Sequence, residues 1–153
     1  MIQATDICEA IGKFDGHIVG SVTLDFDHRR RRRLTLCTDE GTSFLLNLVK
    51  VHTLRDGDIL LLQDGAGVQV RAKCEPVLDI HCSDLKHLVR ISWHLGNRHL
   101  PTELMGDRLR IRQDHVIEQM VKQLGAQTRR LDAPFNPEGG AYGHGETEGH
   151  SHG

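Results

Sequence analysis

The histidines of this chain are concentrated toward its end, where His144, His150 and His152 fall within the last ten residues. The stretch from 143 to 153 otherwise contains glycine, glutamate, threonine and serine, with no apolar side chain to bury. Because nothing there offsets the entropy of ordering the chain, we expect a flexible tail. Neutral imidazole binds zinc, copper and nickel, and short histidine-rich segments are typical of metal binding. The interleaving of these histidines with other residues favours a metal-binding tail over a fragment of a purification tag.

A fourth candidate ligand is His99, which lies in the stretch 93–101. Gly96 and Asn97 are residue types that adopt the left-handed conformation at helix ends, so we expect a helix to stop there and His99 to lie on the following loop. His94 lies about 140° away from His99 on a continuous helix, so the two do not form a ligand pair on one face. A single loop histidine binds metal weakly, and spacing alone leaves open whether His99 is a ligand or a solvated side chain.

The composition describes a modest globular protein without a dominant charge. The 153 residues suffice for one domain or two small ones, and the mean hydropathy is −0.37. A net charge of −2 gives no overall field that would favour nucleic acid or an anionic membrane. The N-terminus lacks the features of a signal peptide, and apolar runs such as Ile59–Leu62 are too short to span a membrane, so we expect a cytoplasmic protein. The four cysteines form no Cys-x-x-Cys pair, which disfavours a zinc finger.

The elements that must position these histidines change character near residue 74. Residues 1–74 show short alternating strands separated by Asp-Gly turns, which predicts a small β-sandwich or barrel-like domain. The predicted strands are 21–26, 33–37, 43–48, 59–62 and 68–72.

Residues 75–142 instead alternate strands with helices. Ser83 or Asp84 can cap a first helix, and Asp114 caps a second that Gly125 closes. The pattern predicts a split βαββαβ, ferredoxin-like unit, and hence an α+β protein overall. Its predicted elements are strands at 75–80, 102–105, 108–112 and 128–131 and helices at 85–96 and 115–124. On the first helix, the spacing places two sets of residues on different faces. One set is Leu85, Leu88, Val89 and Leu95, and the other is His87, Ile91 and His94.

Five consecutive arginines, Arg29–Arg33, raise the possibility of phosphate contacts with a nucleic acid. We expect the run to lie in a strand, where its side chains alternate between two faces. No aromatic stacking platform accompanies it, and acidic residues flank it on both sides. A solvated strand or a protein-docking surface is therefore the favoured interpretation.

Several motifs along the chain together resemble one family. They are Gly96-Asn97-Arg98-His99-x-Pro101, Leu109-Arg110-Ile111-Arg112-x-Asp114-His115-Val116-Ile117, Leu54-Arg55-Asp56-Gly57-Asp58, and Phe135-x-Pro137-x-x-Gly140-Ala141-Tyr142-Gly143 before a tail with histidines. In this combination and order the sequence resembles the UreE family of urease accessory proteins, which are nickel metallochaperones. Each motif alone is weak, but the resemblance covers nearly the whole chain.

The resemblance implies a separate role for each of three parts of the chain. Residues 1–74 would form a β-domain for partner or peptide binding, 75–142 a ferredoxin-like domain for metal binding and dimerisation, and 143–153 a flexible tail. It further implies a homodimer in which His99 of each copy faces its mate, so that one histidine per chain becomes two ligands at the axis. His150 or His152, with His144 as a further candidate, would complete the ligand shell.

The cargo and partners also follow from the resemblance. The protein would deliver Ni²⁺ for assembly of the urease active site, passing it to the accessory GTPase UreG and the complex of urease apoprotein and accessory proteins. It would not be an enzyme, and it would bind neither nucleic acid nor membrane. Zn²⁺ or Cu²⁺ would bind the same ligands, so the choice of nickel rests on the resemblance alone. The tail has fewer histidines than the richest relatives, which disfavours a bulk nickel reservoir.

Two alternatives belong to other functional classes. A metal-dependent hydrolase needs several fixed ligands, an open coordination position and a general base. Glu103 is the plausible base near His99, and one chain supplies too few ligands. The second alternative is an RNA- or peptide-binding adaptor that uses the β-domain and binds metal incidentally.

Overall fold

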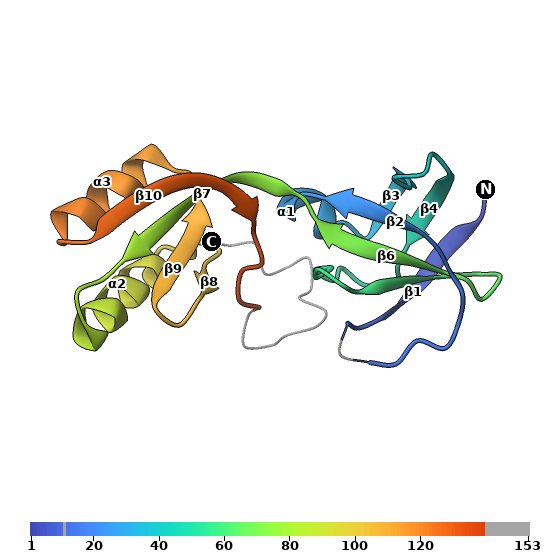
Figure 1. Cartoon of the computed structure of the whole chain (residues 1–153), viewed down its shortest axis with the longest axis horizontal. Coiled ribbons are helices and arrows are strands. Elements are labelled where there is room, and N and C mark those ends of the chain that lie inside the picture. The colour runs from blue at the N-terminus through green and yellow to red at the C-terminus, as the bar shows by residue number, and fades with distance from the viewer. Residues whose placement is uncertain (11, 140–153) are drawn as a thin grey trace. The chain divides into compact units, whose positions relative to one another are not determined.

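The computed structural model describes residues 1–10 and 12–139, which divide into two compact units, Met1–Lys73 and Cys74–Glu138 (Figure 1). The predicted ligands His144, His150 and His152 lie outside the described residues. Among the described residues, no helix is both long and apolar enough to cross a membrane.

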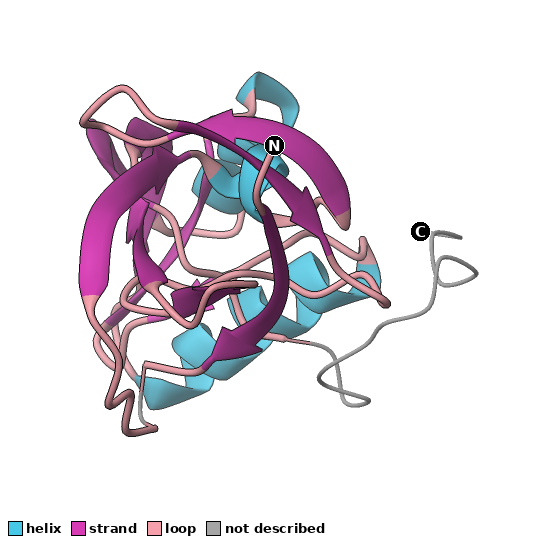
Figure 2. Ribbon diagram, turned by 90° about the vertical axis from the view of Figure 1, so that its right-hand side faces the viewer, coloured by secondary structure: helices cyan, strands magenta, loops and turns pink. Residues whose placement is uncertain are grey.

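The first unit is a six-stranded mixed sheet in the order β2-β6-β5-β1-β4-β3. The pairs β1–β4 and β2–β6 are parallel, and the other neighbours are antiparallel. The strands curve around an apolar core that contains Phe44, Leu46 and Leu60 (Figure 2). The strands are β1 (Gln3–Cys8), β2 (Ile18–Leu24), β3 (Arg33–Cys37), β4 (Ser43–Asn47), β5 (Ile59–Leu62) and β6 (Gly67–Ala72).

The two edges of this sheet are joined through residues next to β3. The Asp39 N–H donates to the Ser21 carbonyl at 2.7 Å. The hydroxyls of Ser21 and Thr23 donate to the Asp39 carboxylate at 2.7 and 2.9 Å. These bonds connect β2 to the end of β3, so of the two predicted forms the barrel-like one describes the unit better. The hydrogen bond from Ser21 also lowers the pKa of Asp39, which keeps the accepting carboxylate ionised.

The arginine run does not lie in a strand as predicted. Phe26–Arg29 form a short helix, α1, because the Asp25 carboxylate caps it by accepting the His28 N–H at 2.9 Å. Arg29 is fully buried and donates to the carbonyls of Leu24 and Leu54. Only Arg33 belongs to β3. The run therefore contributes partly to packing, because Arg29 is buried while the four arginines after it are exposed.

The second unit confirms the ferredoxin-like prediction. Its antiparallel sheet has the order β10-β7-β9-β8, and the chain follows the sequence βαββαβ. One sheet face packs against both helices through a core that includes Leu78, Ile80, Ile91, Ile111 and Val121. The elements are β7 (Cys74–His81), α2 (Leu85–Asn97), β8 (Glu103–Leu104), β9 (Arg108–Arg112), α3 (His115–Gln123) and β10 (Gln127–Pro134).

The two helices begin where capping residues predict. The Asp84 carboxylate accepts the His87 N–H at 2.8 Å, which decides between Ser83 and Asp84, and Asp114 accepts the Ile117 N–H at 3.1 Å. At the end of α3, Gly125 adopts a φ of 89° as predicted.

The predicted division of faces on α2 is wrong. Ile91 and Leu95 are fully buried in the core, whereas Leu85 is 74% and Val89 60% exposed. The sequence pattern contains two apolar stripes on this helix, and the sheet covers the one that contains Ile91.

Candidate metal-binding site

The site begins at the end of α2, where His99 rather than glycine takes the left-handed conformation. Its φ is 57°, and it is the single non-glycine residue with positive φ among those described. The His99 N–H donates to the Gly96 carbonyl at 3.0 Å, and the Leu100 N–H donates to the Leu95 carbonyl at 3.3 Å. This pair of bonds is a Schellman motif, in which the residue after the C-cap is left-handed.

The expectation that Gly96 and Asn97 would end the helix is therefore wrong. Both residues belong to α2, and the chain turns at His99 itself. His99 does lie beyond the helix end, as predicted, and its side chain is exposed. Histidine tolerates this conformation better than most residues, yet the conformation still has a free-energy cost for histidine that it does not have for glycine.

The Schellman motif at the end of α3 has the usual residue, glycine, at its left-handed position. There the Gly125 N–H donates to the Lys122 carbonyl, and the Ala126 N–H donates to the Val121 carbonyl, each at 2.9 Å. Glycine occupies the left-handed position of α3 and histidine that of α2. Backbone strain of this kind is concentrated at functional sites, which makes His99 a candidate on geometry as well as on residue type.

An apolar surface lies along α2 on the approach to His99. Leu85, Val89 and Trp93 recur at intervals of four residues, so they lie along one face of the helix, and each is at least 60% exposed. Gly96 continues this row toward the helix end, and nothing lies within 4 Å of where its Cβ would be. We call these four residues the α2 face. The rings of Trp93 and His94 also form an edge-to-face pair, with their centroids 5.0 Å apart.

Within residues 1–10 and 12–139, no three His, Cys, Asp or Glu side chains lie close enough together to hold a metal ion. His99 is the one predicted ligand in the described part of the chain. The structure therefore lends no support to a hydrolase, which needs several fixed ligands around an open coordination position. His115 is exposed in the first turn of α3 and joins no cluster of this kind.

A buried ionic cluster, which the sequence analysis did not identify, supports the sheet of the same unit. Asp79 on β7 is 3% exposed and accepts hydrogen bonds from Arg110 Nε at 2.7 Å and Arg108 Nε at 3.0 Å. Burial disfavours the charged carboxylate, but the two guanidinium groups more than compensate and lower the pKa of Asp79. The alternating Arg108-Leu109-Arg110 pattern in β9 was the available signal, because its arginines lie on the sheet face opposite the helices.

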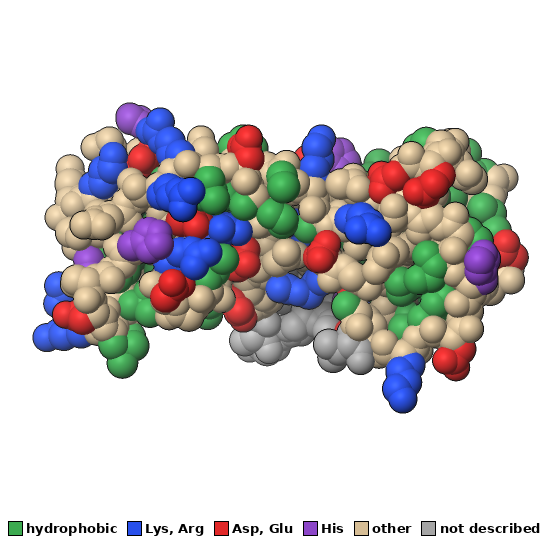
Figure 3. Space-filling view, viewed as in Figure 1, with side chains coloured by type: hydrophobic (Ala, Val, Ile, Leu, Met, Phe, Trp, Pro, Cys, Tyr) green, Lys and Arg blue, Asp and Glu red, His purple; other side chains and the backbone are tan. Residues whose placement is uncertain are grey.

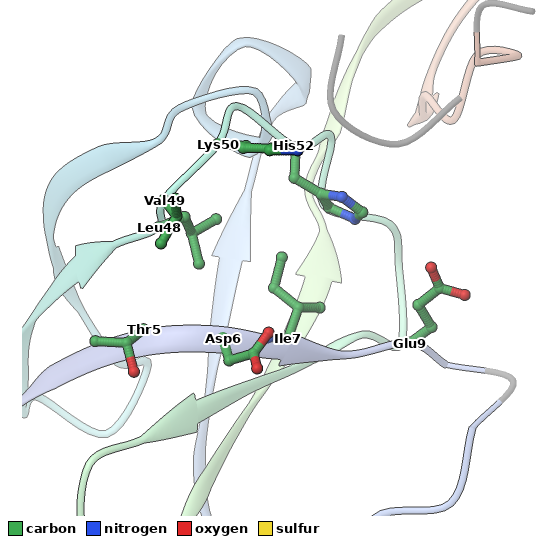
Figure 4. A pocket seen from close by; sticks show the side chains of 8 residues that line it. All are labelled: Thr5, Asp6, Ile7, Glu9, Leu48, Val49, Lys50 and His52. Carbon is green, nitrogen blue, oxygen red and sulfur yellow. The ribbon is translucent and has the colours of Figure 1, made fainter. Parts of the chain in front are cut away.

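The first unit contains a pocket of about 380 Å³, shown in Figure 4. It forms where β1 continues past its short parallel pairing with β4 and the chain after β4 turns away. Its lining mixes apolar, acidic and basic side chains, so it offers surface for a partner but no predicted metal ligand. The lining residues are Thr5, Asp6, Ile7, Glu9, Leu48, Val49, Lys50 and His52.

Charged side chains of both signs are interspersed on the face of the second unit that Figure 3 shows. A nucleic-acid site would require basic side chains gathered into a stripe or patch. The view therefore agrees with the balanced net charge.

Comparison with known proteins identifies the family. Residues 4–73 match the model of the UreE urease accessory protein N-terminal domain, and residues 75–153 match that of the C-terminal domain. The chain belongs to the UreE family. The resemblance inferred from the motifs is thereby confirmed over both units.

Individual relatives named urease accessory protein UreE agree with this family. One from Bradyrhizobium sp. strain BTAi1 is 58% identical over 80% of this chain. Another, from Rhodopseudomonas palustris strain BisB18, is 50% identical over 99% of this chain and 72% of its own length. A third, from Chelativorans sp., is 45% identical over 99% of this chain and 94% of its own length. The chain spans 59% of the length of the relative from strain BTAi1. It spans 62% of the length of a further relative from Bradyrhizobium sp. strain ORS 278, so both shares are below two thirds.

Proposed function

We propose that this protein is a nickel metallochaperone that carries Ni²⁺ for assembly of the urease active site. It acts as a homodimer through its second unit, and His99 from each copy contributes a ligand at the twofold axis. His144, His150 and His152 supply further imidazoles. The names of its relatives, urease accessory protein, support the pathway, and the chemistry of imidazole supports the cargo.

The observation that carries this proposal is the juxtaposition of His99 with the α2 face. One exposed histidine cannot hold a metal ion tightly, and the described residues gather no group of three possible ligands around it. A twofold contact through Leu85, Val89 and Trp93 would bury their apolar surface and bring two copies of the helix end together. Gly96 allows close approach of the two backbones because it has no side chain.

A carrier of this kind has no catalytic role, and two fixed ligands with further tail ligands suit a metal that must be released. Zn²⁺ and Cu²⁺ are expected to compete for the same imidazoles. We further propose that the protein works in the cytoplasm. The accessory GTPase UreG and the complex of urease apoprotein and accessory proteins would receive the metal. The first unit, with its pocket, would bind a partner or peptide.

Nickel titration calorimetry on the wild-type protein and on His99→Ala tests the proposal, with the oligomeric state measured in parallel. We expect a tight binding event of about one nickel per dimer that disappears in His99→Ala while the dimer persists. Removing residues 143–153 should weaken binding or lower the stoichiometry without abolishing it. Tight binding that survives in His99→Ala would place the metal elsewhere and reject the shared site.

A further inference from the structure

The loop that carries His99 leaves a helix at one end and enters an edge strand at the other. At the first end, the two backbone bonds of the Schellman motif attach His99 and Leu100 to α2. At the second end the loop enters β8, which has only two residues, Glu103 and Leu104. A strand of this length forms few ladder bonds, so β8 by itself holds the loop weakly. The second end therefore needs further support if the loop is to stay ordered.

The four residues after β10, 135–138, supply that support, and we call them the strap. The Asn136 N–H donates to Glu103 Oε1 at 2.9 Å, and the Glu138 N–H donates to the Thr102 carbonyl at 2.8 Å. Glu103 lies on β8 and Thr102 just before it, so the strap begins at one edge strand, β10, and ends at the other (Figure 1). Both bonds meet the chain where the His99 loop joins the sheet.

A row of charges across the sheet orients Glu103 for its contact with the strap. Asp79 on β7 pairs with Arg110 on β9, and Arg110 pairs with Glu103 on β8, so the three side chains project from the face opposite the helices. The pKa of Arg110 is raised by its hydrogen bond to Asp79 and also by the charge of Glu103. Arg110 Nη1 donates to the Pro134 carbonyl at 3.2 Å, and the next residue, Phe135, is fully buried. The strap therefore starts beside this row and ends at its last member.

The supported segment leads back to His99. Thr102 is three positions from His99, and its hydroxyl donates to the Leu100 carbonyl at 3.0 Å. The Leu100 side chain in turn packs against the core of the second unit. We infer that Glu103, through its bond to the strap, is a positioning residue that keeps the His99 loop in one conformation before the metal binds. This role rests on the proposed function, in which His99 is a ligand.

An ordered loop should raise the affinity for the metal. A ligand on an ordered loop loses little conformational freedom when it binds, whereas a ligand on a mobile loop must be ordered at the moment of binding. Without the bond between Asn136 and Glu103, the loop would be free to sample other conformations. We therefore expect Glu103→Ala to lower the nickel affinity about two- to tenfold. Glutamine retains an acceptor oxygen, so Glu103→Gln should preserve the affinity.

The first test is amide hydrogen exchange by NMR on the full-length protein without metal. The His99 and Leu100 amides report on the loop, and the Asn136 amide reports on the strap. Glu103→Ala should accelerate exchange at all three amides about two- to tenfold, and Glu103→Gln should leave exchange close to that of the wild type. Asp132→Ala, which removes an exposed carboxylate from β10, is the matched control and should change none of them. Unchanged exchange at His99 and Leu100 in Glu103→Ala would overturn the inference, whatever the nickel affinity.

The second test is nickel titration calorimetry on the full-length wild type, Glu103→Ala and Glu103→Gln. A positioning role predicts an affinity about two- to tenfold lower in Glu103→Ala, an unchanged stoichiometry, and rescue by Glu103→Gln. An equal loss in both variants would make Glu103 a metal ligand and overturn the inference. Faster exchange at His99 with an unchanged nickel affinity would also overturn it, yet leave the proposed function intact. Tight binding that survives in His99→Ala would instead reject the proposed function, and the positioning role with it.

Discussion

At the scale of single residues, the proposed function makes the left-handed histidine at the end of α2 a compromise between stability and binding. The equivalent position of α3 has glycine, with a φ of 89° and no conformational cost. His99 adopts a φ of 57° and leaves its ring exposed just beyond the helix. A residue that serves the fold alone would be glycine here, so the strained position agrees with the ligand role proposed for the imidazole.

This compromise predicts that His99→Gly stabilises the metal-free protein. The free energy of unfolding should rise by about 0.5–1 kcal/mol, because glycine adopts positive φ without the penalty that a side chain imposes. Urea denaturation at fixed protein concentration measures the change. Gly125→Ala should show the opposite sign, a loss of about 1 kcal/mol. A Cβ at Gly125 would meet its nearest atom at 3.7 Å, so the loss there would be conformational and not a clash. If His99→Gly proved destabilising, the strain assigned to His99 would be wrong.

Asp79 predicts how stability depends on pH. Its pKa is lowered in the folded protein, so its contribution is present above the unfolded value of about 3.9 and is lost as pH falls toward the folded value. Asp79→Asn should cost about 3 kcal/mol at pH 7, because it leaves the buried Arg110 without its counter-charge. The difference between wild type and variant should shrink below about pH 4.

Urea denaturation of both proteins at pH 7, 5 and 3.5 checks this dependence. Asp107→Asn is the matched control, since its side chain is 73% exposed and contacts Arg108 alone in the same cluster. It should change the free energy of unfolding by less than about 0.5 kcal/mol. A constant difference between wild type and Asp79→Asn across this range would contradict the role of the charge.

At the scale of elements, local signals in the sequence predicted what local chemistry decides. Asp114 and Gly125 delimit α3 as expected, because caps act within one turn of the chain. Alternation in the stretch 108–112 predicted β9, and the resemblance to the family supported the order of elements around it. Where a segment is compatible with two local structures, its sequence alone did not predict which of them forms.

Two wrong predictions share this cause. The arginine run is compatible with a strand, but the Asp25 cap and the burial of Arg29 favour α1. On α2 two apolar stripes compete, and only the position of the sheet decides which is buried. Residues 135–138 escaped the sequence analysis for another reason, because they have the composition of a loop and their backbone bonds reach residues more than thirty positions away. Long-range contacts of this kind leave no periodic signal in the sequence.

At the scale of the whole molecule, the proposed site exists only if two copies meet. One chain supplies a single fixed imidazole, whereas a twofold axis supplies two. The α2 face provides the apolar surface for that contact, and it lies on the side of α2 that the sheet leaves uncovered. Dimerisation and tight nickel binding should therefore be lost together when the face is disrupted, even by a residue that is not a ligand.

The substitution Val89→Glu tests whether dimerisation and tight nickel binding are lost together. Val89 is 60% exposed within its unit, so a glutamate there should leave the fold intact but place two like charges across the dimer contact. Sedimentation velocity should show a monomer, circular dichroism should show unchanged secondary structure, and calorimetry should show loss of the tight nickel event. Arg90→Glu, one position along and about 100° around the helix, should keep both the dimer and the nickel site. A Val89→Glu monomer that still bound nickel tightly would show that one chain completes the site by itself, and the twofold arrangement of His99 would have to be abandoned.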